Sequence, residues 1–174
     1  MYKALHDVPF DKVRVVILGQ DPYHNPGSAT GRAFETGTSY RNPSLRNIEN
    51  SLGSKINFDL WCEEGVLLLN TSLTVEKGKP GSHLKIWKPF TEEIITKLSQ
   101  ERDDIIWVMW GAKALQYKDL ILNPTHNFVI SSHPSPFSYN KRMKSYPAFQ
   151  DLNSFEQVNK LLSVKSKDPI KWTI

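Results

Sequence analysis

Residues 13–24 read VRVVILGQDPYH, which joins an apolar run to a loop-forming sequence. The run Val13–Leu18 contains one polar residue, Arg14, and it ends at Gly19 and an Asp-Pro pair. An apolar run of this length is typical of a strand that is buried on both faces, as in a parallel sheet. Three similar runs follow, at Val66–Leu69, Ile105–Trp110 and Phe128–Ile130.

Helical patterns lie between and after these runs. Apolar spacing and capping signals predict helices over Pro43–Leu52, Thr91–Arg102, Ala112–Leu122 and Ser154–Leu162. Thr91 is the expected N-cap of the second helix, and Ser154-Phe155-Glu156-Gln157 has the capping-box pattern at the last. Strands alternating with helices predict an α/β fold. We expect one domain over residues 1–174, with a central four-stranded, mostly parallel sheet flanked by helices.

The composition excludes several classes of protein. Cys62 is the only cysteine, so no internal disulfide can form, which favours a reducing compartment. No run of about 18 apolar residues is present, which argues against a membrane span. The first twelve residues have no apolar core, so we do not expect a secretory signal. The expected location is intracellular.

The net charge of +4 is unevenly distributed along the chain. Residues 1–132 hold 15 basic and 15 acidic residues, whereas residues 133–174 hold 7 basic and 3 acidic ones. Such a concentration suggests that one face binds a polyanion. A solvated basic tail would give the same count, so charge alone leaves both interpretations open.

Polar segments follow each predicted strand, where a parallel sheet places its ligands. The first of them, Gly19–Phe34, contains three glycines and two prolines, which favour a rigid, non-repetitive loop. Such a loop can hold the Asp21 carboxylate and two aromatic side chains in fixed positions. An ordinary strand-to-helix turn remains the alternative. The other segments are Asn70–Val75, Gly111–Lys113 and Ser131–Ser138.

Two of the later segments carry residues suited to binding. Asn70 closes an apolar run with an amide, which offers both a donor and an acceptor to a planar ligand. Phe137 lies between proline and serine in His133-Pro-Ser-Pro-Phe-Ser138, where it is a better candidate for a wedge between bases than for the core. The basic stretch Lys141-Arg142-Met143-Lys144 follows, and it could bind phosphates.

Gly19–His24, Leu67–Val75 and His133–Ser138 resemble, in this order, the signature blocks of the family 1 uracil-DNA glycosylases. The resemblance extends over nearly the whole chain. Further similar positions are Ser82-His83, Trp87, Phe90-Thr91 and Pro169-Ile170-Lys171-Trp172.

The resemblance implies an enzyme of base excision repair that flips uracil out of DNA and hydrolyses its N-glycosidic bond. It implies that free uracil is released and an abasic site remains, with no metal and no cofactor. Asp21 would orient the attacking water and stabilise the cationic sugar, because a fixed carboxylate is most effective where positive charge develops. His133, kept neutral, would donate a hydrogen bond to uracil O2.

Base recognition, by the same resemblance, belongs to residues of the first two blocks and to Phe34. Asn70 would match the N3–H donor and O4 acceptor of uracil, a pattern that cytosine reverses. Phe34 would stack on the flipped base, and Tyr23 would fill the space of the thymine methyl group. Gln20 would contribute backbone contacts, and His24 would support the loop of Asp21.

The DNA strand would be held by loops around the pocket. Phe137 would be the intercalating wedge, where the family usually has Leu. The phosphate contacts would use backbone N–H groups, small hydroxyls and basic side chains, which position a strand without reading its sequence. These residues are Ser44, Gly111, Ala112, Ser135, Lys141 and Arg142.

The chain departs from the family pattern at three further places. Asn42-Pro43-Ser44 replaces a usual Pro-Pro-Ser, and Ala112 replaces a usual Ser, which removes one hydroxyl from the phosphate contacts. The first strand begins near residue 13, whereas several dozen residues usually precede it, so the domain is expected to be short at its N-terminus.

The expected partners are uracil-containing DNA, single- or double-stranded, and a proteinaceous glycosylase inhibitor, with the enzyme itself a monomer. The main alternative is a non-catalytic DNA-binding or scaffold protein on the same fold. That alternative predicts the loss of Asp21, Asn70 or His133, and all three are present. No phosphate-binding glycine motif follows the first strand, which argues against a nucleotide-binding enzyme. The histidines and Cys62 lack metal-ligand spacing, so we expect no metal site.

Overall fold

The four predicted strands form one sheet in the computed structural model, which describes residues 1–174. All pairings are parallel and the strand order is β2-β1-β3-β4. The predicted four-stranded parallel sheet is therefore confirmed. The strands are β1 (Val15–Gly19), β2 (Val66–Asn70), β3 (Ile106–Trp110) and β4 (Asn127–Ser131).

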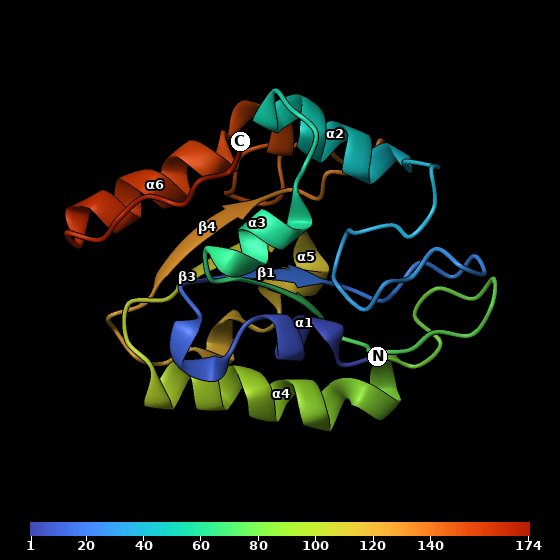
Figure 1. Ribbon diagram of the computed structural model, residues 1–174, viewed down its shortest axis with the longest axis horizontal. Coiled ribbons are helices and arrows are strands. Elements are labelled where there is room, and N and C mark those ends of the chain that lie inside the picture. The colour runs from blue at the N-terminus through green and yellow to red at the C-terminus, as the bar shows by residue number, and fades with distance from the viewer.

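Helices cover both faces of the sheet, which is why every residue of β1, β2 and β3 is buried. In Figure 1, α2 and α6 lie above the sheet, and α4 lies below it. None of the helices combines the length and the apolar character that crossing a bilayer requires. The helices are α1 (Lys3–Asp7), α2 (Pro43–Leu52), α3 (Phe58–Glu63), α4 (Leu84–Glu101), α5 (Ala112–Leu115) and α6 (Ser154–Val164).

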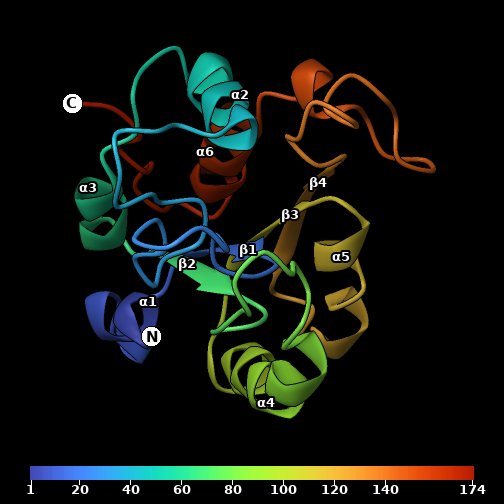
Figure 2. The ribbon, with the colours of Figure 1, turned by 90° about the vertical axis from the view of Figure 1, so that its right-hand side faces the viewer.

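The chain order creates a crevice at the carboxyl edge of the sheet. From β1 the chain moves to β2 on one side, and it then crosses to β3 and β4 on the other side. The loops after β1 and β3 therefore diverge, and such a switch point is the usual ligand site of an open parallel sheet. Figure 2 looks onto this edge, where the loops that follow the strands surround the centre of the view.

An aromatic cluster fastens the C-terminal tail to the upper helices. Trp172 packs edge-on against Trp61 of α3 and Phe155 of α6, with ring centroids 5.0 Å apart in both pairs. The Trp61 indole N–H donates to the Trp172 carbonyl at 2.9 Å. Trp107 and Trp110, on β3, are also buried in the core. The tail thus closes the core on this side of the sheet.

Helix α4 differs from its prediction because it begins at Leu84 instead of after Thr91. Pro89 lies inside this helix, in its second turn, so the chain remains helical despite one missing N–H donor. Thr91 is therefore not an N-cap. It is buried, and its hydroxyl donates to the Thr71 carbonyl at 2.8 Å, which joins α4 to the end of β2.

Two other helix predictions are corrected by local hydrogen bonding. The predicted helix Ala112–Leu122 ends at Leu115, because Tyr117 donates to the Ala114 carbonyl and starts a tighter 3-10 turn. At α6 the cap is Asn153, whose side chain accepts from the Glu156 N–H. The Ser154 hydroxyl accepts from the Trp110 indole instead, at 3.0 Å. Helix Pro43–Leu52 was predicted correctly, and α1 and α3 were not predicted.

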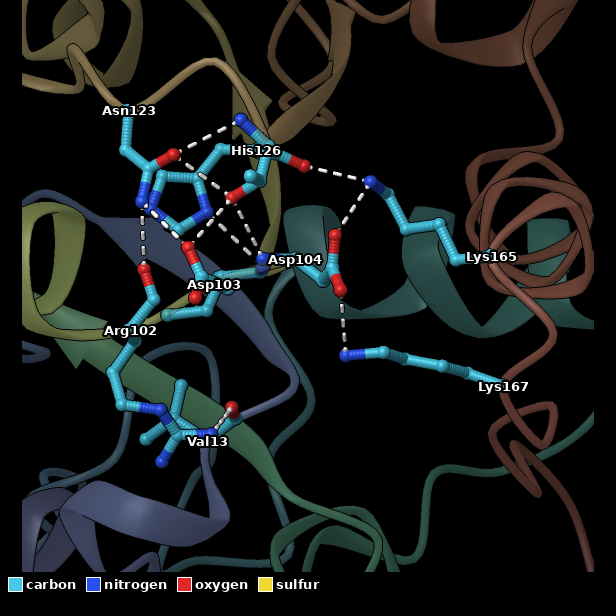
Figure 3. Close-up of polar contacts among 10 residues, drawn as sticks. Val13, Arg102, Asp103, Asp104, Asn123, His126, Lys165 and Lys167 are labelled. Atoms are coloured by element: carbon cyan, nitrogen blue, oxygen red, sulfur yellow. Dashed lines mark hydrogen bonds and ion pairs between the residues drawn. The ribbon is translucent and has the colours of Figure 1, made fainter.

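A polar cluster at the amino edge of the sheet joins β3, β4 and α6 (Figure 3). Asp104 forms ion pairs with Lys165 at 2.8 Å and with Lys167 at 3.2 Å. His126 Nδ1 accepts from the Ile105 N–H at 3.0 Å, and its Nε2 lies 3.2 Å from the Ser99 carbonyl. Because Nδ1 accepts, Nε2 carries the proton and donates to that carbonyl. Burial lowers the pKa of His126.

This histidine makes the stability of the fold depend on pH. Because the pKa of His126 is lower in the folded chain, the unfolded chain takes up the proton first as the pH falls below about 6.5. We therefore expect the free energy of unfolding to decrease between pH 7 and 5. The variant His126→Gln should show a shallower decrease in urea titrations at several pH values, and an unchanged pH dependence would contradict this role.

Candidate active site

The end of β1 is packed directly against the end of β2. Gly19 pairs with Asn70, and a Cβ atom at Gly19 would lie 2.4 Å from the Asn70 amide oxygen and 2.8 Å from Ala33 Cβ. Only glycine fits this approach. The amide of Asn70, which is buried, is thereby held at the carboxyl edge of the sheet.

The loop after β1 fixes a carboxylate beside this amide. The Thr71 hydroxyl and the Ser72 N–H both donate to the Gln20 carbonyl, at 2.9 and 2.8 Å. The Asp21 carboxylate accepts from the Gly81 backbone N–H and, at 3.3 Å, from the Gln20 side chain. Asp21 is thus oriented by donors from two loops, and no sequence pattern indicates the contact with Gly81.

Phe34 forms one wall of the site with a strained backbone. Its φ of 66° lies in the left-handed region, which is rare for a bulky residue. The Tyr23 hydroxyl donates to the Phe34 carbonyl at 3.0 Å, and burial raises the pKa of this tyrosine, so the donor stays protonated. The Phe34 ring centroid lies 5.5 Å from Trp110 and 6.3 Å from His133.

An ion network beneath Phe34 holds this conformation. The Arg32 side chain is only 4% exposed, and it contacts three carboxylates. They are Asp7 of α1 at 2.6 Å, Glu35 at 3.0 Å and Asp59 of α3 at 2.8 Å. Because Arg32 and Glu35 flank Phe34, the network anchors the chain on both sides of the aromatic residue. The network was not predicted from the sequence, because Asp7 and Asp59 are 25 and 27 residues away from Arg32 in the chain.

His133 is positioned by the loop after β4 and by Gly111. A Cβ atom at Gly111 would lie 2.8 Å from His133 Cβ, so glycine is needed for this packing. The Ser135 backbone N–H donates to His133 Nδ1 at 3.0 Å. Nε2 therefore carries the proton and is free to donate to a ligand. Burial lowers the pKa of His133, which favours the neutral ring.

The loop that follows His133 presents an apolar side chain to solvent. Phe137 is 85% exposed at the tip of this loop. The loop is held from within, because the hydroxyls of Ser135 and Ser138 lie 2.9 Å apart. It is also held from outside, because the Asn47 side chain of α2 donates to the Pro134 carbonyl at 2.7 Å. Phe137 is thus exposed on a braced loop, as a wedge would require.

A cavity of about 210 Å³ unites these elements. All six residues predicted for catalysis or base binding line it, together with Ser44 from the first turn of α2. A larger cavity of about 430 Å³ adjoins it along Pro22–His24, but neither Asp21 nor His133 reaches that space. Both residues predicted for catalysis, Asp21 and His133, thus line the smaller cavity and not the larger one. The six residues are Gln20, Asp21, Tyr23, Phe34, Asn70 and His133.

The remaining predicted DNA contacts lie on the loops around this cavity. Gly111 and Ala112 begin α5, and Ser135 and Phe137 belong to the loop after β4. Further along this segment, Lys141 and Arg142 are exposed. None of these residues lines the cavity itself.

A sequence profile of the uracil DNA glycosylase superfamily matches residues 6–155, which include every residue of the cavity. The chain belongs to the uracil DNA glycosylase superfamily.

Relatives within this superfamily match over almost the full chain. The uracil-DNA glycosylase of Streptococcus thermophilus is 41% identical over 180 residues, covering 99% of this chain and 80% of the relative. The crystal structure of mimivirus uracil-DNA glycosylase superposes with a TM-score of 0.94 at 29% identity, covering 99% of this chain and 72% of that one. A mimivirus UNG variant solved in complex with UGI has the same TM-score at 30% identity, covering 100% and 74%.

The excess basic residues of this uracil DNA glycosylase homologue, which lie in residues 133–174, do not form a single surface. The uneven charge along the chain had suggested that they would form one face for a polyanion. Lys165 and Lys167 pair with Asp104 at the amino edge of the sheet, and Lys160 pairs with Glu156 on α6. Part of the positive charge of the C-terminal quarter is therefore neutralised by ion pairs within the protein. Its exposed stretch near the site is Lys141-Arg142-Met143-Lys144.

The geometry of His133 predicts a spectroscopic signature. Because Ser135 donates to Nδ1 and burial opposes protonation, His133 should be the Nε2–H tautomer and titrate below the ordinary histidine value of about 6.5. Nitrogen chemical shifts of the ring across a pH series measure both properties. An Nδ1–H tautomer, or a pKa at or above the ordinary value, would contradict the assigned hydrogen bond.

Proposed function

We propose that this chain is a uracil-DNA glycosylase that hydrolyses the bond between uracil and deoxyribose in DNA. The observation that carries the proposal is the convergence of Asp21, Phe34, Asn70 and His133 on one cavity. An amide, an aromatic ring, a carboxylate and a neutral imidazole are the groups that this reaction needs. The names of the relatives support the same conclusion.

Uracil is recognised by its hydrogen-bonding edge and by its flat face. The Asn70 amide accepts from N3–H and donates to O4, and cytosine presents the opposite pattern. A mismatched polar edge leaves buried groups unpaired, which can discriminate by roughly 10⁴-fold or more. Phe34 stacks on the base, and Tyr23, fixed by its bond to the Phe34 carbonyl, excludes the thymine methyl group.

The reaction is a hydrolysis in which charge separates across the glycosidic bond. As this bond breaks, its electron pair moves into the uracil ring and positive charge develops on the sugar. The Asp21 carboxylate stabilises that charge and orients the attacking water. The water oxygen bonds to the sugar carbon and the water loses one proton, while the uracil anion takes up one proton and leaves as free uracil. His133 Nε2–H donates to the O2 atom of the leaving uracil, where the negative charge collects.

The substrate is DNA from which the uracil nucleotide is turned into the cavity. Phe137 fills the gap left in the base stack, and an apolar side chain of this size can do so. The phosphates on either side are held by Ser44, by the Gly111-Ala112 turn and by Ser135, with Lys141 and Arg142 nearby. We place the enzyme with DNA inside the cell. We also infer that a protein inhibitor can bind this chain, because a mimivirus UNG variant has been solved in complex with UGI.

The decisive assay offers a duplex with one deoxyuridine and measures free uracil. Asp21→Asn and His133→Ala should each lower the single-turnover rate by about 10²- to 10⁴-fold while the fold is retained. Asp11→Asn, which changes an exposed carboxylate before β1, is the matched control. No uracil release by the wild type, or unaltered rates in the two variants, would refute the proposal or the assigned roles.

The wedge makes a separate prediction about substrate form. Phe137→Ala should slow the release of uracil from a duplex more than its release from a single strand, because only the duplex stack must be opened. Leu122→Ala serves as the control, because it removes a similarly exposed apolar side chain, 79% exposed, that does not line the cavity. Equal losses on both substrates would exclude a wedge.

A further inference from the structure

A second hollow, of about 290 Å³, lies between the start of α4 and α5. Lysine side chains from both helices line it: Lys85 and Lys88 from α4, and Lys113 from α5. Glu92 is the only carboxylate in its lining, and Tyr117 is buried at its base. The lining of the hollow therefore holds three lysines and one carboxylate.

The positive charge in this hollow is only partly neutralised within the protein. Lys88 lies 3.6 Å from Glu92, whereas Lys85 and Lys113 are exposed and take part in no ion pair. Lys85 also lies in the first turn of α4, a turn without any acidic residue. A cation is disfavoured there by the helix dipole, which favours anions instead. The position of Lys85 therefore destabilises the helix electrostatically, and an anion bound in the hollow would offset this destabilisation.

The hollow is adjacent to the catalytic cavity. The loop before α4 contains Gly81, whose N–H donates to Asp21, and Gly111, which caps α5, packs against His133. Figure 2 shows the start of α4 on one side of the carboxyl edge and the segment after β4 on the other side. The hollow and the segment after β4 thus lie on different sides of the carboxyl edge.

We propose that this hollow binds the phosphodiester backbone of the DNA strand that flanks the uracil, with Lys85 and Lys113 as its phosphate ligands. The inference rests on the proposed function, which supplies a DNA strand at the neighbouring cavity. The contact carries no sequence information, because an ammonium group on a flexible stem neutralises a phosphate without reading a base. This contact would hold the DNA strand beyond the Gly111-Ala112 turn. The turn has one phosphate-binding hydroxyl fewer than the family pattern, because Ala112 replaces a usual Ser, and the two lysines would compensate for that hydroxyl.

The test compares two double variants with equal changes in net charge. Lys85→Gln/Lys113→Gln alters the hollow. Lys12→Gln/Lys171→Gln alters two exposed lysines at the amino edge of the sheet, one before β1 and one beside Glu64, which precedes β2. The probes are a single strand of roughly 20 nucleotides and a trinucleotide, each with one deoxyuridine. A long strand with thymidine in place of deoxyuridine measures binding without turnover, by fluorescence anisotropy over a range of salt concentrations.

The hollow variant should lose on the order of tenfold in kcat/KM on the long strand, and clearly less on the trinucleotide, which is too short to extend far beyond the cavity. The slope of log affinity against log salt should become shallower by up to about 1.4, or about 0.7 for each lost phosphate contact. The amino-edge variant should keep the wild-type slope and the wild-type kcat/KM.

An unchanged salt slope in the hollow variant would overturn the proposal. So would equal losses in both double variants, which would indicate a general effect of net charge, or equal losses on the two substrate lengths. If the wild-type chain released no uracil, the proposed function would fail. The anisotropy measurement on thymidine DNA would still decide whether the hollow binds the strand.

Discussion

The parallel pairing of β1 with β2 is the constraint on which the rest of the site depends. Its register places Gly19 opposite Asn70, and the close approach of the two residues leaves no space for a Cβ atom. A shift by one residue would turn the Asn70 side chain to the other face of the sheet. The same pairing brings Thr71 and Ser72 to the Gln20 carbonyl, and so sets the direction in which Asp21 leaves the sheet.

Sequence reasoning succeeded where short-range patterns determine structure. Apolar runs identified all four strands, and the polar segments after them contained every residue that lines the cavity except Ser44, which belongs to α2. It failed where a distant partner competes with a local signal. Thr91 has the sequence of a cap but bonds to the Thr71 carbonyl, and Ser154 bonds to the Trp110 indole, so Asn153 caps α6 in its place. The support of Asp21 by Gly81 and of Phe34 by Arg32 depends on contacts between distant segments, which no spacing encodes.

The distribution of charge along the chain also differs from its distribution in the folded structure. Counting along the chain assigned the positive surplus to the last quarter, yet Lys165 and Lys167 serve to hold α6 against Asp104 at the amino edge. Lys85 and Lys113, from the part of the chain whose net charge is zero, meet at the carboxyl edge. A polyanion responds to charges that are close in space, so the surface is the relevant unit.

The left-handed backbone of Phe34 has opposite effects on the stability of the fold and on the affinity for the base. Such a conformation costs of the order of 1–3 kcal/mol, and this chain meets the cost when it folds, before any base arrives. If the backbone at residue 34 were relaxed, the folded chain would be more stable. The ring would then lose conformational entropy when it stacks on the base, and that loss would weaken binding. Substitutions that remove this backbone strain are thus expected to raise the melting temperature and, if Phe34 has its proposed stacking role, to weaken the binding of the base. Selection for thermal stability alone would act against the enzyme here.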